Sequence, residues 1–361
     1  MAVYFISYFV LLGAGFALHI TKLLESKAGK ILYMSLVWLT LTLIGGMRSV
    51  NISYDGYAYK TAFDYFANTP WKMPWSYSYF MEYGFYVFCK LISVFGGTHQ
   101  SLLFLSSGFI VFAMCRFLYK HSDHLMFSTL LLLSYPYFYT SFDLIRYYMA
   151  LSVVLLAFDF VLERKFVPYL VCILIAMLFH KMAVIMLALF WLPQVKWNFI
   201  AFGIVGAVTA AATLFPQQIA SVFSVVFNDY QSYVSGSNTH WFGSFSGGIK
   251  TAFMYVLLLV ISVLAFQNKD KSNGHNNLCL GFMIIETAAA VFFINASIAI
   301  RLLVTFLPYM SVGISSLLGD KGCHNQVTQV LLRYVTVLIC VAYHAFLVLN
   351  DWQNIVPYTT F

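Results

Sequence analysis

The sequence predicts an all-α polytopic membrane protein. Of its 361 residues, 61% are hydrophobic and only 9% are charged, and the mean hydropathy is +0.81. Apolar runs recur from one end of the chain to the other, and a helix of about 20 such residues crosses the hydrocarbon core of a bilayer. No internal repeat or linker interrupts this pattern. We therefore expect a single integral membrane domain over residues 1–361.

These runs predict about twelve transmembrane helices. The first run, Tyr4 to Ile20, has no basic residue before it and no small-residue cleavage pattern after it, which indicates a retained helix rather than a signal peptide. Two runs between residues 166 and 195 are short, so their ends are the least defined. The predicted spans cover residues 2–20, 31–47, 101–118, 125–141, 146–162, 166–180, 182–195, 198–214, 249–267, 278–296, 300–318 and 328–349.

A shorter apolar run, residues 82–96, has the length of a re-entrant or interfacial helix rather than of a span. It carries Lys90 in its middle and ends in Gly96-Gly97. If it does not cross, most basic loops fall on one side, as the positive-inside rule requires of the cytoplasm. The alternative is that this run crosses and a neighbouring one does not. The cations placed inside are Lys22, Lys27, Lys30, Arg116, Lys120, Arg164, Lys165, Lys196, Lys269, Lys271, Lys321 and Arg333.

This orientation puts both ends of the chain and two larger loops on the outer side. One loop spans about residues 48–100 and contains the aromatic run Trp71–Phe80, and the other spans about residues 216–248. Within the first loop, residues 57–66 have the pattern of an amphipathic helix, which would lie flat in the interface or form an ordinary loop helix. Its apolar face would hold Tyr59, Phe63 and Phe66, and its polar face Lys60 and Asp64.

Three arginines lie on the outer side, where the charge rule does not favour them. Arg48, Arg146 and Arg301 each sit at a helix end beside an apolar run. The planar guanidinium binds two oxygens of a phosphate or carboxylate at once, so together they predict a phosphate-binding site. The alternative for any one of them is interfacial snorkelling or helix-end pairing.

Other charged residues near helix ends extend this prediction. Lys181 could hold a phosphate as a point charge, and the adjacent His180 could donate to it or move a proton, although a lone histidine is more often structural. Asp143 lies three residues before Arg146, close enough to meet it on one helical face. Glu286, near the middle of a span, is expected to be paired or protonated inside the bundle, in a structural role.

Asp55 is the best candidate base of the outer loop. It follows a helix end by only a few residues, so it can stay near the membrane surface. The alternative is that it starts a turn or caps the next helix. No Asp-x-Asp motif, nucleotide-binding loop or nucleophile elbow occurs, so we expect no metal and no cofactor. The net charge of +7 reflects basic cytoplasmic loops and does not indicate a nucleic-acid partner.

In its ordered short motifs, the chain resembles the EpsG/Wzy-type polymerases of bacterial surface polysaccharides, which are GT-C-like membrane glycosyltransferases. The motifs cover most of the chain, and their order and spacing are more specific than any one of them. They are Gly46-Met47-Arg48-Ser49, then Asp55 and Tyr59, Glu82-Tyr83-Gly84-Phe85, Ser141-Phe142-Asp143-Leu144-Ile145-Arg146, Leu178-Phe179-His180-Lys181, Arg301 and Pro357-Tyr358.

The resemblance implies a substrate and a location. The substrate would be an oligosaccharide repeat unit on undecaprenyl pyrophosphate, polymerised into O-antigen or a similar polysaccharide at the periplasmic face of the bacterial inner membrane. A chain-length regulator and a flippase would be candidate partners. Tyr59 and Glu82 join the expected substrate-binding residues. Two departures concern the key positions: Asn51-Ile52-Ser53-Tyr54 replaces the family's Gly-Thr-Asp-type stretch, and Arg146 is followed by Tyr147 rather than Gln.

The expected chemistry is glycosyl transfer. Asp55 and His180 are the candidate catalytic residues, and Arg48, Arg146, Lys181 and Arg301 would stabilise the departing pyrophosphate. A lipid-linked oligosaccharide flippase is an alternative, although a transporter would show charges on both sides of the midplane and repeat symmetry. An O-antigen ligase or another GT-C enzyme is a second alternative, which shares the donor and differs in the acceptor.

Overall fold

The computed structural model describes residues 1–361 apart from 72–80, 216, 219–220, 222–245, 271–272 and 296–299. The chain divides into two compact units. The first contains Met1–Pro193 and Val341–Phe361, and the second contains Gln194–Cys340. The expectation of a single membrane domain stays a prediction.

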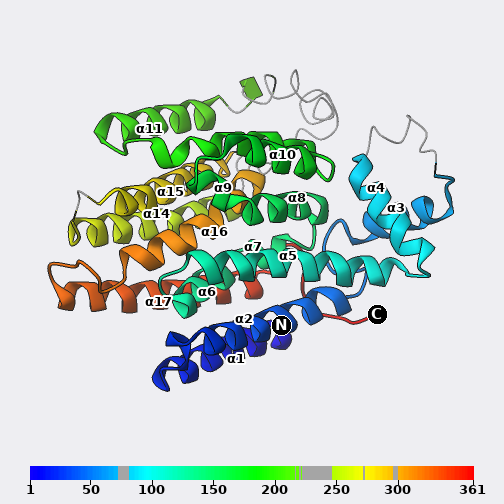
Figure 1. Cartoon of the computed structure of the whole chain (residues 1–361), viewed down its shortest axis with the longest axis horizontal. Helices are drawn as coiled ribbons and strands as arrows, with labels where there is room; N and C mark the ends of the chain where they lie inside the picture. The colour runs from blue at the N-terminus through cyan, green and yellow to red at the C-terminus, as the bar shows by residue number, and fades with distance from the viewer. Residues whose placement is uncertain (72–80, 216, 219–220, 222–245, 271–272, 296–299) are drawn as a thin grey trace. The chain divides into compact units, whose positions relative to one another are not determined.

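The first unit is helical throughout its described residues, and Figure 1 shows its long helices α1, α2 and α5 running side by side. The helix α17, Gln326–Leu349, ends in this unit. Its other elements are α1 (Ala2–Ile20), η1 (Leu23–Glu25), α2 (Lys27–Met47), α3 (Gly56–Asn68), α4 (Tyr83–Val94), α5 (His99–His121), α6 (Leu125–Ser134), α7 (Tyr137–Thr140), α8 (Ile145–Leu156), α9 (Phe158–Leu162), α10 (Phe166–Met177), η2 (Lys181–Phe190) and the start of η3 (Leu192–Gln194).

The second unit is also helical in its described part. The helix α15 packs against α14, α16 and α11, so it forms the centre of this unit. The remaining outer loop predicted at 216–248 lies almost entirely outside the described residues. The elements are α11 (Phe199–Leu214), α14 (Ser246–Gln267), α15 (Gly274–Phe292), α16 (Ile300–Leu317) and the first part of α17.

Six of the described helices are long and apolar enough to cross a membrane. Shorter apolar helices of 10–17 residues also occur among the described residues. The chain is therefore a multi-pass helical membrane protein, whereas the count of twelve crossings and their orientation stay predictions. The six long segments are Ala2–Ile20, Lys27–Met47, His99–His121, Gly248–Gln267, Ile300–Leu317 and Gln326–Leu349.

Three predicted spans differ from the structure in their local geometry. The run 125–141 is interrupted after Ser134, because Pro136 lacks the N–H that a continuing helix needs. The run 146–162 is split at Ala157, between α8 and α9. The run 182–195 forms the tighter 3₁₀ helices η2 and η3 instead of an α-helix. A 3₁₀ stretch as long as η2 is uncommon, since its hydrogen bonds have poorer geometry.

The packing of α2 against α5 brings the end of α2 close to the middle of α5. At Gly45 an added Cβ would lie 2.6 Å from the Ser107 hydroxyl oxygen, so only glycine allows this approach. Small residues commonly let membrane helices pack this closely. The contact places Arg48, which follows the last residue of α2, beside Ser107.

The short helices α3 and α4 pack together through aromatic rings. Tyr59, Phe63 and Phe66 are buried on one face of α3, as the sequence pattern predicts. On the opposite face Lys60 and Asp64 form an exposed ion pair. The aromatic run Trp71–Phe80 that joins the two helices lies, after Trp71, outside the described residues.

Lys90 in the middle of α4 is explained by this packing. Its ammonium is buried and donates to the carbonyl oxygens of Ala67 at 2.9 Å and Thr69 at 2.6 Å. A cation at the C-terminal end of a helix satisfies carbonyls that have no partner within the helix. Lys90 therefore joins α4 to the end of α3.

Candidate active site

Glu82 connects three segments that lie far apart in the sequence. It precedes α4, and its carboxylate forms an ion pair with Arg146 of α8 through Oε2 and Nη1. Its other oxygen, Oε1, accepts a hydrogen bond of 3.1 Å from the backbone N–H of Lys181. The Glu82 side chain is 10% exposed and that of Arg146 is 22% exposed. Solvent therefore reaches the pair only in part, so its attraction is weakly screened.

The position of α4 is fixed by a close backbone contact. The Gly84 N–H donates to the carbonyl oxygen of Leu178 at 2.8 Å. A Cβ at residue 84 would lie 2.6 Å from that oxygen, so no other residue fits without movement. This contact holds Glu82 against the start of η2.

Tyr59 approaches the same guanidinium from α3. Its phenol is buried and hydrogen-bonds with Arg146. Burial raises the pKa of Tyr59, and the charge of Arg146 acts in the opposite direction. Tyr59 is therefore neutral at physiological pH. The Nε–H of Arg146 is buried and has no acceptor among the described residues. The side chain is 22% exposed, so an anionic oxygen can approach the guanidinium from its exposed side.

His180 lies next to this cluster, just before η2. The ring is buried, and Nδ1 accepts a hydrogen bond of 3.2 Å from the N–H of Met182. In the neutral ring the proton therefore sits on Nε2. The edge of the Tyr147 ring packs against it, with centroids 5.2 Å apart. His180 therefore caps η2, which agrees with the structural role that a lone histidine more often has. Its catalytic role stays a prediction.

Asp55 precedes α3, but its side chain makes no capping hydrogen bond. The residue is exposed, and its negative charge acts on Tyr59. Its backbone N–H donates to Oδ1 of Asp143 at 3.1 Å. The Asp55 carboxylate therefore does not cap α3 in this structure. Instead, the side chain lies near Tyr59.

The predicted pairing of Asp143 with Arg146 is wrong. The helix α8 begins only at Ile145, so Asp143 lies in the preceding turn and not on a shared helical face. It is 5% exposed and accepts the N–H of Asp55, whereas Arg146 pairs with Glu82. Burial raises the pKa of Asp143 to about 7, although the hydrogen bond from Asp55 acts in the opposite direction. The sequence interpretation missed the contact of Asp143 with Asp55, since the two residues are 88 positions apart.

Arg48 is held inside the protein. Its guanidinium donates to the carbonyl oxygen of Gly45 and to the Ser107 hydroxyl, and it lies 4.4 Å from the centre of the Phe142 ring. Burial lowers the pKa of Arg48 to about 10, and the neighbouring Asp143 partly offsets this effect. Arg48 therefore stays a cation at neutral pH, and these contacts favour a structural role.

The remaining predicted residues lie at different places. The backbone of Lys181 joins the cluster through Glu82, and the residue is exposed. Arg301 belongs to the second unit, at the start of α16, so its part in phosphate binding stays a prediction. Among the described residues, no group of three His, Cys, Asp or Glu side chains could hold a metal ion. The expected independence of metals stays a prediction.

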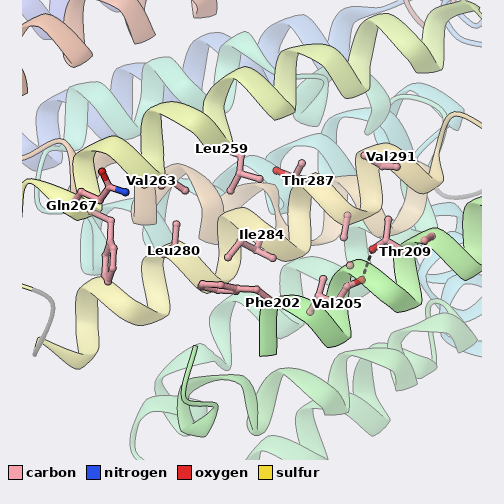
Figure 2. Close-up of a pocket in the computed structure, with 14 residues that line it drawn as sticks. Phe202, Val205, Thr209, Leu259, Val263, Gln267, Leu280, Ile284, Thr287 and Val291 are labelled. Atoms are coloured by element: carbon pink, nitrogen blue, oxygen red, sulfur yellow. Dashed lines mark hydrogen bonds between the residues drawn. The ribbon is translucent and has the colours of Figure 1, made fainter. Parts of the chain in front are cut away.

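The second unit contains an apolar groove between α11, α14 and α15. Figure 2 shows Phe202 and Val205 of α11 facing Leu280 and Ile284 of α15 across it. Its volume is about 670 Å³. Thr209 and Thr287 are among its few polar side chains, and Thr209 donates to the carbonyl oxygen of Val205 within its own helix. Such a surface suits hydrocarbon rather than a polar ligand.

Comparison with known proteins identifies one family. The model of the EpsG family matches residues 31–360, which include every residue of the cluster described above. No curated protein and no solved structure matches the chain.

Proposed function

Because the chain belongs to the EpsG family, we propose that it is a membrane glycosyltransferase that joins lipid-linked oligosaccharide repeat units into a surface polysaccharide. Family membership indicates a polysaccharide polymerase-type function. The finer proposal is that the donor is a growing chain on undecaprenyl pyrophosphate, that the acceptor is a single repeat unit on the same lipid, and that the reaction occurs at the periplasmic face of the inner membrane.

The observation that carries this proposal is the arrangement around Arg146. Its guanidinium is oriented by the Glu82 carboxylate and the Tyr59 phenol, and its Nε–H is buried without an acceptor in the described part of the chain. A preorganised cation of this kind stabilises negative charge that develops on a leaving group. Arg146, helped by Lys181, would therefore bind the pyrophosphate that departs from the donor.

The acceptor side of the reaction requires a base. A hydroxyl of the incoming repeat unit attacks the reducing-end sugar of the donor, the bond from that sugar to the pyrophosphate breaks, and the hydroxyl proton is taken up. Asp55 is the proposed proton acceptor, because its exposed carboxylate lies near Tyr59, which in turn contacts Arg146. His180 is retained as the alternative proton carrier.

The test is polymer formation by the purified protein in lipid nanodiscs with undecaprenyl-pyrophosphate-linked repeat units. We expect the wild-type protein to produce a ladder of chain lengths. Asp55→Asn keeps the shape of the side chain and removes the base, so the rate should fall by about 100- to 10,000-fold. Binding of the lipid-linked substrate should persist, because Arg146 is unchanged.

The matched control is Asp64→Asn, which neutralises an exposed carboxylate of α3 that pairs with Lys60. It should leave the ladder unchanged. A near-normal ladder from Asp55→Asn would reject the assignment of the base, since Asn keeps the shape of the side chain but does not accept the proton. Transfer of the donor chain to an acceptor other than an undecaprenyl-linked repeat unit, without polymer, would identify a ligase instead.

A further inference from the structure

We propose that residues 351–361 act as a strap that positions the Asp55 loop, which we define as residues 48–55, for catalysis. The anchors of the strap are Ile355 and Tyr358. The proposal rests on the proposed function, because it assigns a positioning role within the same reaction.

The strap and the loop are joined by backbone hydrogen bonds. The Ser49 N–H donates to the carbonyl oxygen of Thr359 at 2.8 Å, and the Ser53 N–H donates to that of Asn354 at 3.0 Å. Next to the Ser49–Thr359 bond, Arg48 and Thr360 form an isolated antiparallel bridge. In Figure 1 the red trace of the strap lies beside the end of α2. About 300 residues separate these partners in the sequence, so the loop is closed by a remote part of the chain.

Two anchors hold the strap in the first unit. The Ile355 side chain is fully buried, and its carbonyl oxygen accepts a hydrogen bond of 2.9 Å from the Tyr4 phenol. The Tyr358 phenol donates to the carbonyl oxygen of Ile44 at 2.9 Å, near the end of α2. The ring of Tyr358 also packs edge to face against Tyr4, with centroids 5.6 Å apart. The strap is therefore attached to two membrane helices, α1 and α2.

The backbone conformation shows that the loop needs such support. Ser53 has a φ of 82° and its strap partner Asn354 has a φ of 54°, both in the left-handed region. Asparagine tolerates this region, whereas serine rarely adopts it. A residue holds such a conformation only when its surroundings determine it. The Ser53–Asn354 hydrogen bond is part of those surroundings, and Ser53 lies two residues before Asp55.

The consequence for the reaction follows from this position. The Asp143 carboxylate fixes the end of the loop by accepting the Asp55 N–H, and the strap fixes the beginning and middle. Without the strap, the Asp55 carboxylate would sample more positions relative to the acceptor hydroxyl. Misplacement of a reacting group by about 1 Å can lower a rate by about 100-fold.

The test uses the full chain with Ile355→Ala, which removes the buried anchor, and measures amide hydrogen exchange in peptides covering residues 48–54. We expect exchange at Ser49 and Ser53 to rise at least about 10-fold and kcat for polymer formation to fall by about 10- to 100-fold. The KM for the lipid-linked donor should stay unchanged, because the Arg146 site is intact. Ile355→Val should restore both readouts.

The matched control is Phe361→Ala, since the Phe361 side chain is 71% exposed and lies on the same strap. It should change neither exchange nor kcat. If Ile355→Ala fails to fold, Tyr358→Phe, which deletes only the phenol hydroxyl, should give smaller changes in the same directions. Unchanged exchange at Ser49 and Ser53 would overturn the proposal, as would faster exchange with an unchanged kcat. The exchange readout does not depend on catalysis, so a failure of the proposed function would appear separately, as a wild-type protein that makes no polymer.

Discussion

The two units treat their buried polar groups differently. In the first unit, Arg146 meets a carboxylate from α4 and a phenol from α3, at the ends of elements and with partial access to solvent. In the second unit, Glu286 is fully buried near the middle of α15, with Tyr255 of α14 beside it. A polar group at an element end can be reached by a substrate, whereas one in the centre of a helix bundle mainly determines how the helices pack. The difference supports the proposal that the chemistry occurs in the first unit.

The strongest test of this comparison is to substitute one arginine in each unit and to measure polymer formation. Arg146→Ala should lower polymer formation by about 100- to 1,000-fold, as expected when one preorganised donor to a developing charge is lost. Arg146→Lys should recover only part of the rate, because a point charge does not replace the planar fork. The ladder of chain lengths and the amount of protein in the membrane are the measurements.

Arg301→Ala is the matched variant in the second unit. The sequence predicts that it also abolishes polymer at normal protein levels, because Arg301 was assigned to the pyrophosphate. If it does so, the second unit takes part in the reaction and the comparison fails. If Arg301→Ala still makes full-length polymer, Arg301 is not part of the site, and the difference between the two units becomes clearer.

The second prediction concerns Asp143 and pH. Its pKa rises from 3.8 to about 7 on burial, so the folded protein binds a proton that the unfolded chain has already lost. This contribution to stability is complete below about pH 4 and is lost as the pH rises through 7. Each pKa unit corresponds to about 1.4 kcal/mol, so the effect is on the order of a few kcal/mol.

Asp143→Asn tests the sign of this effect, since Asn keeps an acceptor for the Asp55 N–H but does not ionise. Thermal unfolding in detergent should show the variant gaining stability relative to the wild type between pH 5 and pH 8. Arg48, Asp55 and Tyr54 surround this carboxyl and are the same in both proteins. If the difference in stability between the two proteins does not change with pH, the pKa of Asp143 is the same in the folded and unfolded states.

The smallest expected effect is that of Glu286→Gln. A neutral amide resembles a protonated carboxyl in shape and in hydrogen bonding, so stability should change by no more than about 1 kcal/mol. Polymer formation should remain close to that of the wild type. A large loss of activity with normal folding would show that a charge at this position is used, and it would bring the second unit into the mechanism.

Most of the fold was predictable from hydropathy, because each helix that crosses a bilayer must consist largely of apolar residues. The long helices α1, α2, α5, α14, α16 and α17 were predicted on this basis. Hydropathy did not predict the break between α6 and α7, although Pro136 was a visible signal. It also did not predict that η2 is a 3₁₀ helix, since 3₁₀ and α-helices share the same apolar composition.

Three members of the candidate cluster were predictable from the sequence, but their pairing was not. The positions of Tyr59, Glu82 and Arg146 in short motifs marked them as candidates, and the structure brings these three together. Which carboxylate pairs with Arg146 depends on tertiary contacts. The sequence therefore favours the nearby Asp143, whereas the structure has Glu82, 64 residues away. The sequence predicts a phosphate-binding role for Arg48 from its place at a helix end, and it does not show that Ser107 and Phe142 surround the side chain.

We expect almost no amino acid other than glycine to be tolerated at position 84 during evolution. The smallest possible side chain, a single methyl group, would strike the backbone oxygen of Leu178, and a backbone yields less readily than the end of a flexible side chain. The resulting shift of α4 would carry Glu82 away from both Arg146 and the Lys181 N–H. We therefore expect this glycine to be conserved among relatives as strictly as Glu82 and Arg146, whose contact depends on it. The neighbouring Tyr83, more than half exposed, should vary among relatives.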